Sequence, residues 1–191
     1  SMVAAQRYVD WIFNDSAYCN SLPILYRNLG DDFVKIIEPL NSVPVLFFGS
    51  CRNDFARLYL EVYDLYQQQG ACGERCNVLL QKALQFNPYS ADYFWNTLFP
   101  YQAAAITEAL SKHDANETLV KWQESMAAIK IVEQVRLDNQ VNQDRGIGQQ
   151  QHMLELAQLI EPLLSNLEVQ QQQPAREMIK NDVRWLYTSL E

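Results

Sequence analysis

The sequence predicts an all-α protein, either an irregular helical bundle or a short α-solenoid of helical hairpins, with a repeat-like hairpin at its centre. Apolar residues recur at spacings of three and four in every long segment, which is the period of an amphipathic helix. The 191 residues include only 6 glycines, few for a turn-rich β fold, and 48% are hydrophobic, enough for a substantial core. One apolar run, residues 43–48, has the composition of a strand. Because a lone strand would leave its backbone groups unpaired, we interpret it as the buried start of a helix or an apolar connector.

The N-terminal residues are expected to form short helices that lead into the domain. Apolar spacing indicates one helix over residues 3–13. A second is expected between Pro23, in its first turn, and Gly30, at its end. A third follows and stops at Pro39, since proline cannot continue a helix.

Residues 56–98 are expected to form the central helical hairpin. Its first helix runs to Gln69 and is ended by Gly70, which reaches positive φ without a steric cost. Its second helix is stopped by the pair Asn87-Pro88. If the helices pack across the Gly70 turn, Tyr66 and Leu80 belong to the core.

At these residues the chain resembles a tetratricopeptide repeat, a helical hairpin of about 34 residues. The resemblance rests on residues in the family's order: Tyr59, Tyr66, Gly70, Leu80, Ala83, Leu84 and Pro88. The chain departs from the family at Tyr63, where a small residue is preferred, and in a turn at 71–75 that is one residue too long. The resemblance covers about residues 56–98 only. It implies hairpins whose first helices line a surface that holds a partner.

The next two helices are bounded by proline and by a capping residue. Residues 90–110 read as a helix with a kink or break at Pro100. A longer helix follows, capped by Asp114 or Asn116 and reaching Gln143. The polar residues after it, with Gly146 among them, indicate a loop or linker.

A C-terminal helical pair completes the chain. Its first helix is expected to kink or break near Glu161, before Pro162. A four-glutamine connector at 170–173 then leads to a last helix with Pro174 at its first position. The expected organisation is therefore a helical domain at 1–143, a loop or linker at 144–150, and a helical pair at 151–191 packed on the same core.

The cysteines are expected to be buried reduced thiols. The chain contains Cys19, Cys51, Cys72 and Cys76. A structural zinc site usually takes its ligands from two close pairs, and only Cys72 and Cys76 form one. The two histidines lie far away in the sequence, and a chain of this size does not need a disulfide framework. We therefore expect no metal, no cofactor and no disulfide.

Composition also narrows the class of function. The net charge is −8 and the basic residues are scattered, which argues against nucleic acid as a partner. No apolar run is long enough to span a bilayer and no leader opens the chain, so we expect an acidic cytoplasmic protein without a membrane span. Phosphate-binding and metalloprotease motifs are missing, and Ser50 and Cys51 do not form a nucleophile elbow. These observations favour a protein that is not an enzyme.

The sequence therefore predicts a non-enzymatic protein–protein interaction module, an adaptor or a subunit of a larger assembly. Its partner is expected to be a peptide or helical segment of another protein. The alternatives are a chaperone for a secreted or unfolded client and an enzyme of unknown class. The expected partner-binding residues are Tyr59, Tyr63, Tyr93 and Trp95, as flat contact area, and Arg57 and Asn96, which could fix a peptide backbone or carboxylate. The aromatic residues could alternatively form a broad core face.

Overall fold

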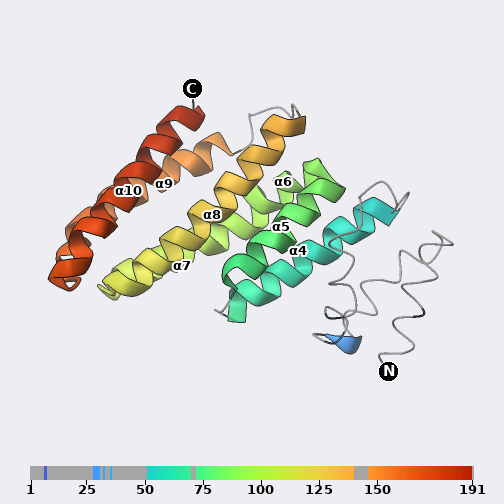
Figure 1. Cartoon of the computed structure of the whole chain (residues 1–191), viewed down its shortest axis with the longest axis horizontal. Helices are drawn as coiled ribbons and strands as arrows, with labels where there is room; N and C mark the ends of the chain where they lie inside the picture. Colours follow the sequence, from blue (N-terminus) through green and yellow to red (C-terminus); the bar gives the residue numbers. More distant parts are fainter. Residues whose placement is uncertain are drawn as a thin grey trace. The chain divides into compact units, whose positions relative to one another are not determined.

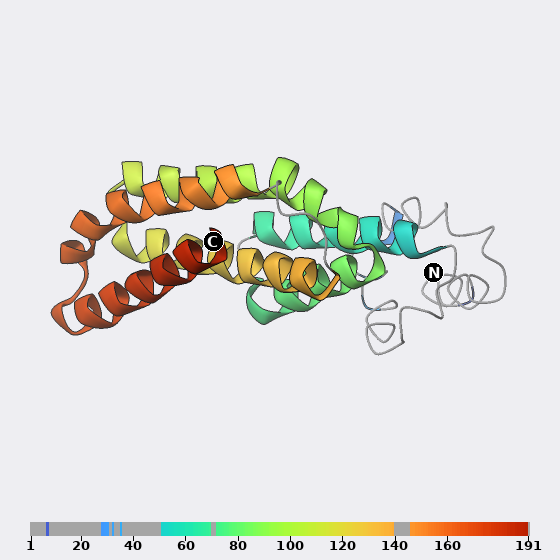
Figure 2. The same ribbon diagram turned by 90° about the horizontal axis from the view of Figure 1, so that it is seen from above.

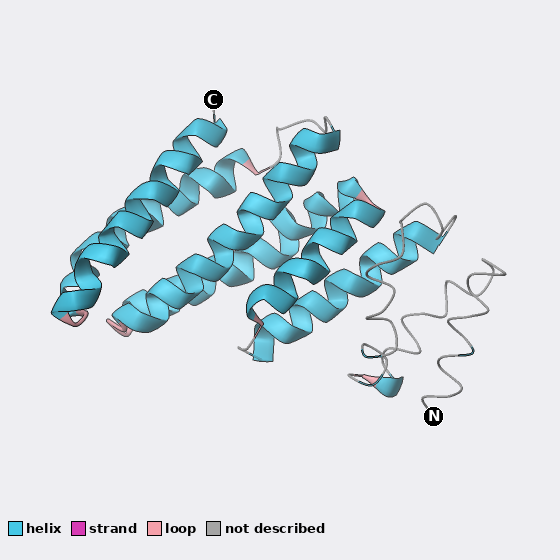
Figure 3. Cartoon of the chain, viewed as in Figure 1, coloured by secondary structure: helices cyan, strands magenta, loops and turns pink. Residues whose placement is uncertain are grey.

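The computed structural model describes residues 51–69, 72–139 and 146–190, together with Arg7, residues 28–30, Asp32 and Lys35. Within these residues the regular structure is helical and no strand is present (Figure 3), which confirms the all-α prediction. The strand candidate at 43–48 lies outside the described residues. So do nearly all positions of the short helices expected before it.

The chain divides into two compact units, Ser1–Ser90 and Ala91–Glu191 (Figure 1). The division falls where the central hairpin ends, whereas the sequence suggested a loop or linker at 144–150. Helices on both sides of that expected linker belong to the second unit. Residues 140–145 lie outside the described residues.

The first unit contains a helical hairpin of α4 (Arg52–Gln69) and α5 (Gly73–Phe86). The Phe86 ring lies 5.6 Å from that of Phe55 and 5.5 Å from that of Tyr59, so the end of α5 packs on the start of α4. Tyr66 and Leu80 are both buried, as expected for this hairpin. After α5 the backbone of Asn87 is extended, as the residue before a proline prefers, and a short 3₁₀ turn, η4 (Pro88–Ser90), closes the unit.

The cysteines of this unit differ from the expectation of reduced thiols. Cys72 and Cys76 form a disulfide, with Cα atoms 5.2 Å apart, and Cys51 is also disulfide-bonded. The described part of the chain therefore holds no free thiol. Residues four apart at a helix start lie one above the other on the same face, which brings Cys72 and Cys76 together without any help from tertiary structure.

The second unit contains two helical hairpins. In the first, α6 (Ala91–Tyr93), a π-helical segment η5 (Phe94–Leu98) and α7 (Phe99–Ser111) follow one another without a loop, and α8 (Ala115–Asn139) returns. The second pairs α9 (Ile147–Ile160), extended by the 3₁₀ segment η6 (Glu161–Asn166), with α10 (Val169–Leu190). The first helices α7 and α9 lie side by side, and α8 contacts α10 (Figure 2). The unit is a short stack of hairpins.

Two helix boundaries of this unit follow the chemistry of single residues. The Asp114 carboxylate accepts a hydrogen bond of 3.0 Å from the Glu117 amide and so caps α8, as predicted. Pro162 marks the change from the α9 helix to the tighter η6 segment, which confirms the break expected near Glu161.

The start of α10 differs from its prediction. Pro174 lies inside α10, and the four glutamines expected as a connector form its first turns. The Gln172 amide donates hydrogen bonds to the carbonyl oxygens of Leu167, at 2.9 Å, and Ser165, at 3.2 Å. These bonds satisfy carbonyl groups at the end of the preceding turn. We infer that they help the helix begin upstream of the proline.

The core of the second unit contains one apolar face of α8, which the spacing of its residues predicts. Trp122, Met126 and Ile129 are all buried. The Trp122 indole donates a hydrogen bond of 2.8 Å to Asp182 of α10, and the Lys130 ammonium lies 2.9 Å from the other oxygen of that carboxylate. A polar contact thus joins α8 to α10 in the core of the unit.

Candidate functional site

The π-helical segment frees a backbone carbonyl group. The Phe99 amide donates to the carbonyl oxygen of Phe94, five residues earlier, instead of to that of Trp95. Pro100 has no N–H to offer, so it cannot supply the missing bond. The side chain of Gln149 on α9 donates to the Trp95 carbonyl oxygen instead, at 3.5 Å. The irregularity expected at Pro100 therefore takes the form of a π turn, and its free carbonyl bonds to α9.

Aromatic rings pack around this turn. Trp95 is only 3% exposed, and its ring centre lies 5.0 Å from that of Phe94 and 5.6 Å from that of Phe99. Gly146, just before α9, packs against the indole so closely that a Cβ there would come within 2.6 Å of Cε2. The start of α9 therefore lies directly against the π turn.

An open groove of about 900 Å³ runs between α7 and α9. We call it the α7–α9 groove. One wall, which we call the α7 wall, is formed by Trp95 of η5 together with Phe99, Pro100, Ala103, Ala104, Thr107, Glu108 and Ser111 of α7. The α9 wall is formed by Gly148, Gln149 and His152. Most of the α7 wall is apolar, and the small residues Ala103, Ala104 and Gly148 leave the groove wide. Pro100, Ala104 and His152 are exposed, so the groove is open to solvent.

The polar side chains of the groove are all bonded within the chain. Thr107 donates to the Ala103 carbonyl, Ser111 to the Glu108 carbonyl, and Gln149 to the Trp95 carbonyl. Glu108 pairs with Lys112 at 3.2 Å, and His152 contacts Glu155 at 3.4 Å. The hydrogen bond and the charge of Glu108 raise the pKa of Lys112 above its ordinary value. The groove thus presents apolar surface and few unpaired polar groups.

The helices that form the groove are acidic. The stretch 91–111 and helix α9 contain no lysine or arginine, but they contain Asp92, Glu108 and Glu155. The second unit as a whole has fourteen acidic and eight basic residues, which gives it a net charge of −6. A partner that binds at the groove therefore approaches a surface with a negative electrostatic potential.

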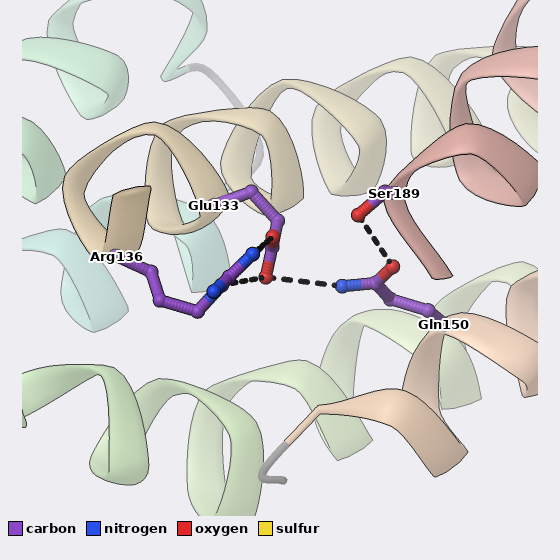
Figure 4. Close-up of polar contacts among 4 residues, drawn as sticks. All are labelled: Glu133, Arg136, Gln150 and Ser189. Atoms are coloured by element: carbon purple, nitrogen blue, oxygen red, sulfur yellow. Dashed lines mark hydrogen bonds and ion pairs between the residues drawn. The ribbon is translucent and has the colours of Figure 1, made fainter. Parts of the chain in front are cut away.

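A buried polar network holds the first turns of α9 in place (Figure 4). Glu133 of α8 is 3% exposed and accepts two bonds from Arg136, of 3.0 Å at Nε and 2.9 Å at Nη2. The amide of the buried Gln150 donates to Glu133 at 3.2 Å, and its oxygen accepts from Ser189 of α10 at 3.0 Å. Because Gln150 follows Gln149 directly, the network fixes the turn of α9 that forms the groove wall.

Two further grooves of this unit are smaller and more polar. One, of about 430 Å³ between α9 and α10, is lined in part by Glu161, Arg176, Glu177 and Lys180. The other, of about 390 Å³ between α8 and α10, includes several glutamines. The α7–α9 groove exceeds both in volume and in apolar character, which makes it the stronger candidate for a binding site.

The structure places the six predicted binding residues in different environments. Tyr59 and Tyr63 are buried in the first unit, where Arg57 is exposed and pairs with Glu61 at 3.3 Å. In the second unit Tyr93 is 41% exposed, and Asn96 is exposed. Trp95 alone of the six lines the α7–α9 groove, as part of its buried floor. Tyr59 and Tyr63 therefore offer a partner no free contact area, and we assign them to the core.

Most groove residues were not identified from the sequence. The run Ala103-Ala104-Ala105 after a cluster of aromatic residues was the available signal, because small residues on an exposed helix leave space beside large ones. Gly146 gave a second signal, which its polar neighbours favoured as part of a linker. A glycine before an apolar helix is also compatible with close packing, and Gly146 packs on Trp95.

Comparisons with protein-family models, with curated proteins and with solved structures found no match for this chain. Within the described residues there is no cluster of three or more metal-ligating side chains. No described helix combines the length and the apolar character needed to cross a membrane.

Proposed function

We propose that the chain is a non-enzymatic protein–protein interaction module, an adaptor or a subunit of a larger assembly, that holds a segment of another protein in the α7–α9 groove. The position of the groove carries this proposal. It lies between the first helices of two successive hairpins, so side chains from both helices can contact one ligand. Stacked helical hairpins commonly use such surfaces for binding.

The shape of the groove favours a macromolecular ligand over a small molecule. Its volume falls within the range of small-molecule pockets, but such pockets enclose most of their ligand. Here Ala104, Glu108 and His152 are exposed along the groove, so a bound molecule would remain open to solvent on one side. A protein segment suits this geometry, because the rest of the partner can cover the exposed side.

The test is a substitution that fills the groove without disturbing the core. Ala104 lines the groove and is exposed, so Ala104→Trp places an indole in the binding space. Gln151→Trp is the matched control, because Gln151 is exposed on α9 and does not line the groove. Circular dichroism should show that both variants keep the helical fold.

Tagged full-length chains are then recovered from the cells that naturally produce the protein, and co-purifying proteins are quantified by mass spectrometry. We expect one stoichiometric partner with the wild type and with Gln151→Trp, reduced at least about tenfold with Ala104→Trp. The same set of proteins at the same levels with all three chains would refute binding at the groove. Many unrelated clients lost together with Ala104→Trp would indicate a chaperone instead.

A further inference from the structure

The hydrogen bonding of the groove distinguishes between two kinds of protein ligand. An extended peptide carries unpaired backbone N–H and C=O groups, which cost free energy when they are buried without partners. Each of the five polar side chains that line the groove already has one partner within the chain, and the other lining residues, apart from the Trp95 indole, carry no side-chain donor or acceptor. No strand is present in the described residues to offer an edge for pairing. A helix satisfies its own backbone and needs none of these groups.

The dimensions of the groove also suit a helix. Its α7 wall extends from Trp95 to Ser111, which at 1.5 Å per residue corresponds to about 24 Å, and its α9 wall from Gly148 to His152 corresponds to about 6 Å. A partner helix of about 16 residues has the length of the longer wall. The small side chains of Ala103, Ala104 and Gly148 leave room for large apolar residues in the middle of the groove. A helix presents such residues at positions i, i+3, i+4 and i+7.

Charge indicates the polar face of that helix. Glu108 lies in the α7 wall, and Glu155 lies one turn beyond His152 of the α9 wall. Neither groove helix contains a lysine or arginine, although Lys112, directly after α7, pairs with Glu108. The unit as a whole has a net charge of −6. Electrostatic complementarity therefore favours a ligand with basic residues beside its apolar face.

We infer that the α7–α9 groove receives a basic amphipathic helix of a partner protein, about four turns long, with its apolar face on the aromatic and alanine residues of α7. Its lysines and arginines lie toward Glu108 and Glu155 at the rims. This inference rests on the proposed function of the groove and adds the conformation and charge of the ligand.

The experiment offers the purified full chain two libraries of displayed 16-residue peptides. The first library has apolar residues at spacings of three and four and random Lys, Arg, Glu or Asp at the other positions. The second has alternating apolar residues and regular prolines, which prevent a helix. Enriched peptides are synthesised, and their affinities are measured by fluorescence anisotropy for the wild type, Ala104→Trp and Gln151→Trp.

We expect enrichment from the helical library of peptides rich in Lys and Arg. Ala104→Trp should weaken their binding at least about tenfold, and Gln151→Trp should change it less than about twofold. Glu155→Lys should weaken binding about threefold or more and reduce its dependence on salt between about 50 and 300 mM, because it reverses a charge at the rim. Glu177→Lys on α10 is the control for a charge reversal outside the groove and should have little effect.

The outcomes separate this inference from the proposed function. Extended or acidic peptides whose binding is lost with Ala104→Trp would refute the basic helix and leave the groove as a binding site. An unchanged affinity of basic helices for Glu155→Lys would refute the role of the acidic rim. If no enriched peptide is sensitive to Ala104→Trp, both the inference and the binding site at the groove are wrong.

Discussion

Gly146 packs against the Trp95 indole, although the two residues are 51 positions apart in the sequence. The φ angle of Gly146 is +101°, a conformation that side chains rarely adopt. A Cβ at this position would lie 2.6 Å from Cε2 and 2.8 Å from Nε1 of Trp95. Backbone conformation and packing therefore both require glycine at the start of α9.

Gly146→Ala should lower the free energy of unfolding by about 2 kcal/mol or more, because it adds backbone strain and forces the Trp95 ring to move. Urea unfolding followed by circular dichroism measures the change. Gly148→Ala is the matched control, since nothing lies within 4 Å of a Cβ there and the residue is inside a helix. It should change stability by less than about 1 kcal/mol, in the stabilising direction. Equal effects of the two substitutions would contradict the packing of Gly146 on Trp95.

Arg136→Ala should destabilise the second unit by about 3–5 kcal/mol, because the buried Glu133 carboxylate loses the guanidinium group that binds it through two nitrogens. Chemical denaturation provides the measurement. Arg184→Ala on the exposed side of α10 is the control and should cost less than about 0.5 kcal/mol. A loss below about 1 kcal/mol for Arg136→Ala would show that Glu133 is not held in a buried ion pair.

Asp182→Asn should destabilise the protein less than Asp182→Ala. Asp182→Ala removes the acceptor of the buried Trp122 indole, and an unsatisfied donor costs about 1–3 kcal/mol. Asp182→Asn keeps an oxygen that can accept this bond and loses only the ion pair with the half-exposed Lys130. The midpoint of thermal unfolding should therefore be highest for the wild type, lower for Asp182→Asn and lowest for Asp182→Ala. Equal losses of stability for Asp182→Asn and Asp182→Ala would show that the charge of Asp182, and not its hydrogen bond with Trp122, accounts for the effect.

Leu80→Ala should cost about 2–5 kcal/mol, since Leu80 is fully buried and its truncation leaves a cavity in the α4–α5 hairpin. Val78→Ala, two residues earlier on the exposed side of α5, is expected to cost less than about 1 kcal/mol. Urea unfolding of both variants tests this. A small effect at Leu80 would contradict the packing of the hairpin.

The features that the sequence predicted correctly depend on local chemistry. Asp114 caps α8 with its own carboxylate, and Pro88 ends α5 through the restriction it places on Asn87. Pro162 likewise ends the regular part of a helix through its missing N–H. Each of these effects acts within four residues, so a short stretch of sequence is enough to predict the helix boundary.

Other features depend on partners elsewhere in the fold. Trp95, expected either to contact a partner or to form part of a core face, is 3% exposed and packs against Gly146, which comes from another hairpin. Pro174 was expected to begin a helix, but α10 starts five residues earlier, where Gln172 reaches the carbonyl groups of the preceding turn. The sequence shows that a tyrosine or tryptophan can pack or bind. Which of the two it does depends on what lies against it.

The π turn at Phe94–Leu98 lets the helix hold one extra residue without changing the face that α7 presents to α9. Each residue of an α-helix turns the chain by about 100°, and a π turn holds one residue more than the α turn it replaces. Loss of one residue from 96–98 would therefore let this turn become α-helical, and Ala103 and Ala104 would remain in the wall of the groove. Loss of Gln102, in the regular part of α7, would instead rotate Ala103 and Ala104 by about 100° relative to Trp95. In variants of this chain, a single-codon deletion should therefore leave the groove intact within the π turn, whereas the same deletion in α7 would move the two alanines out of the groove.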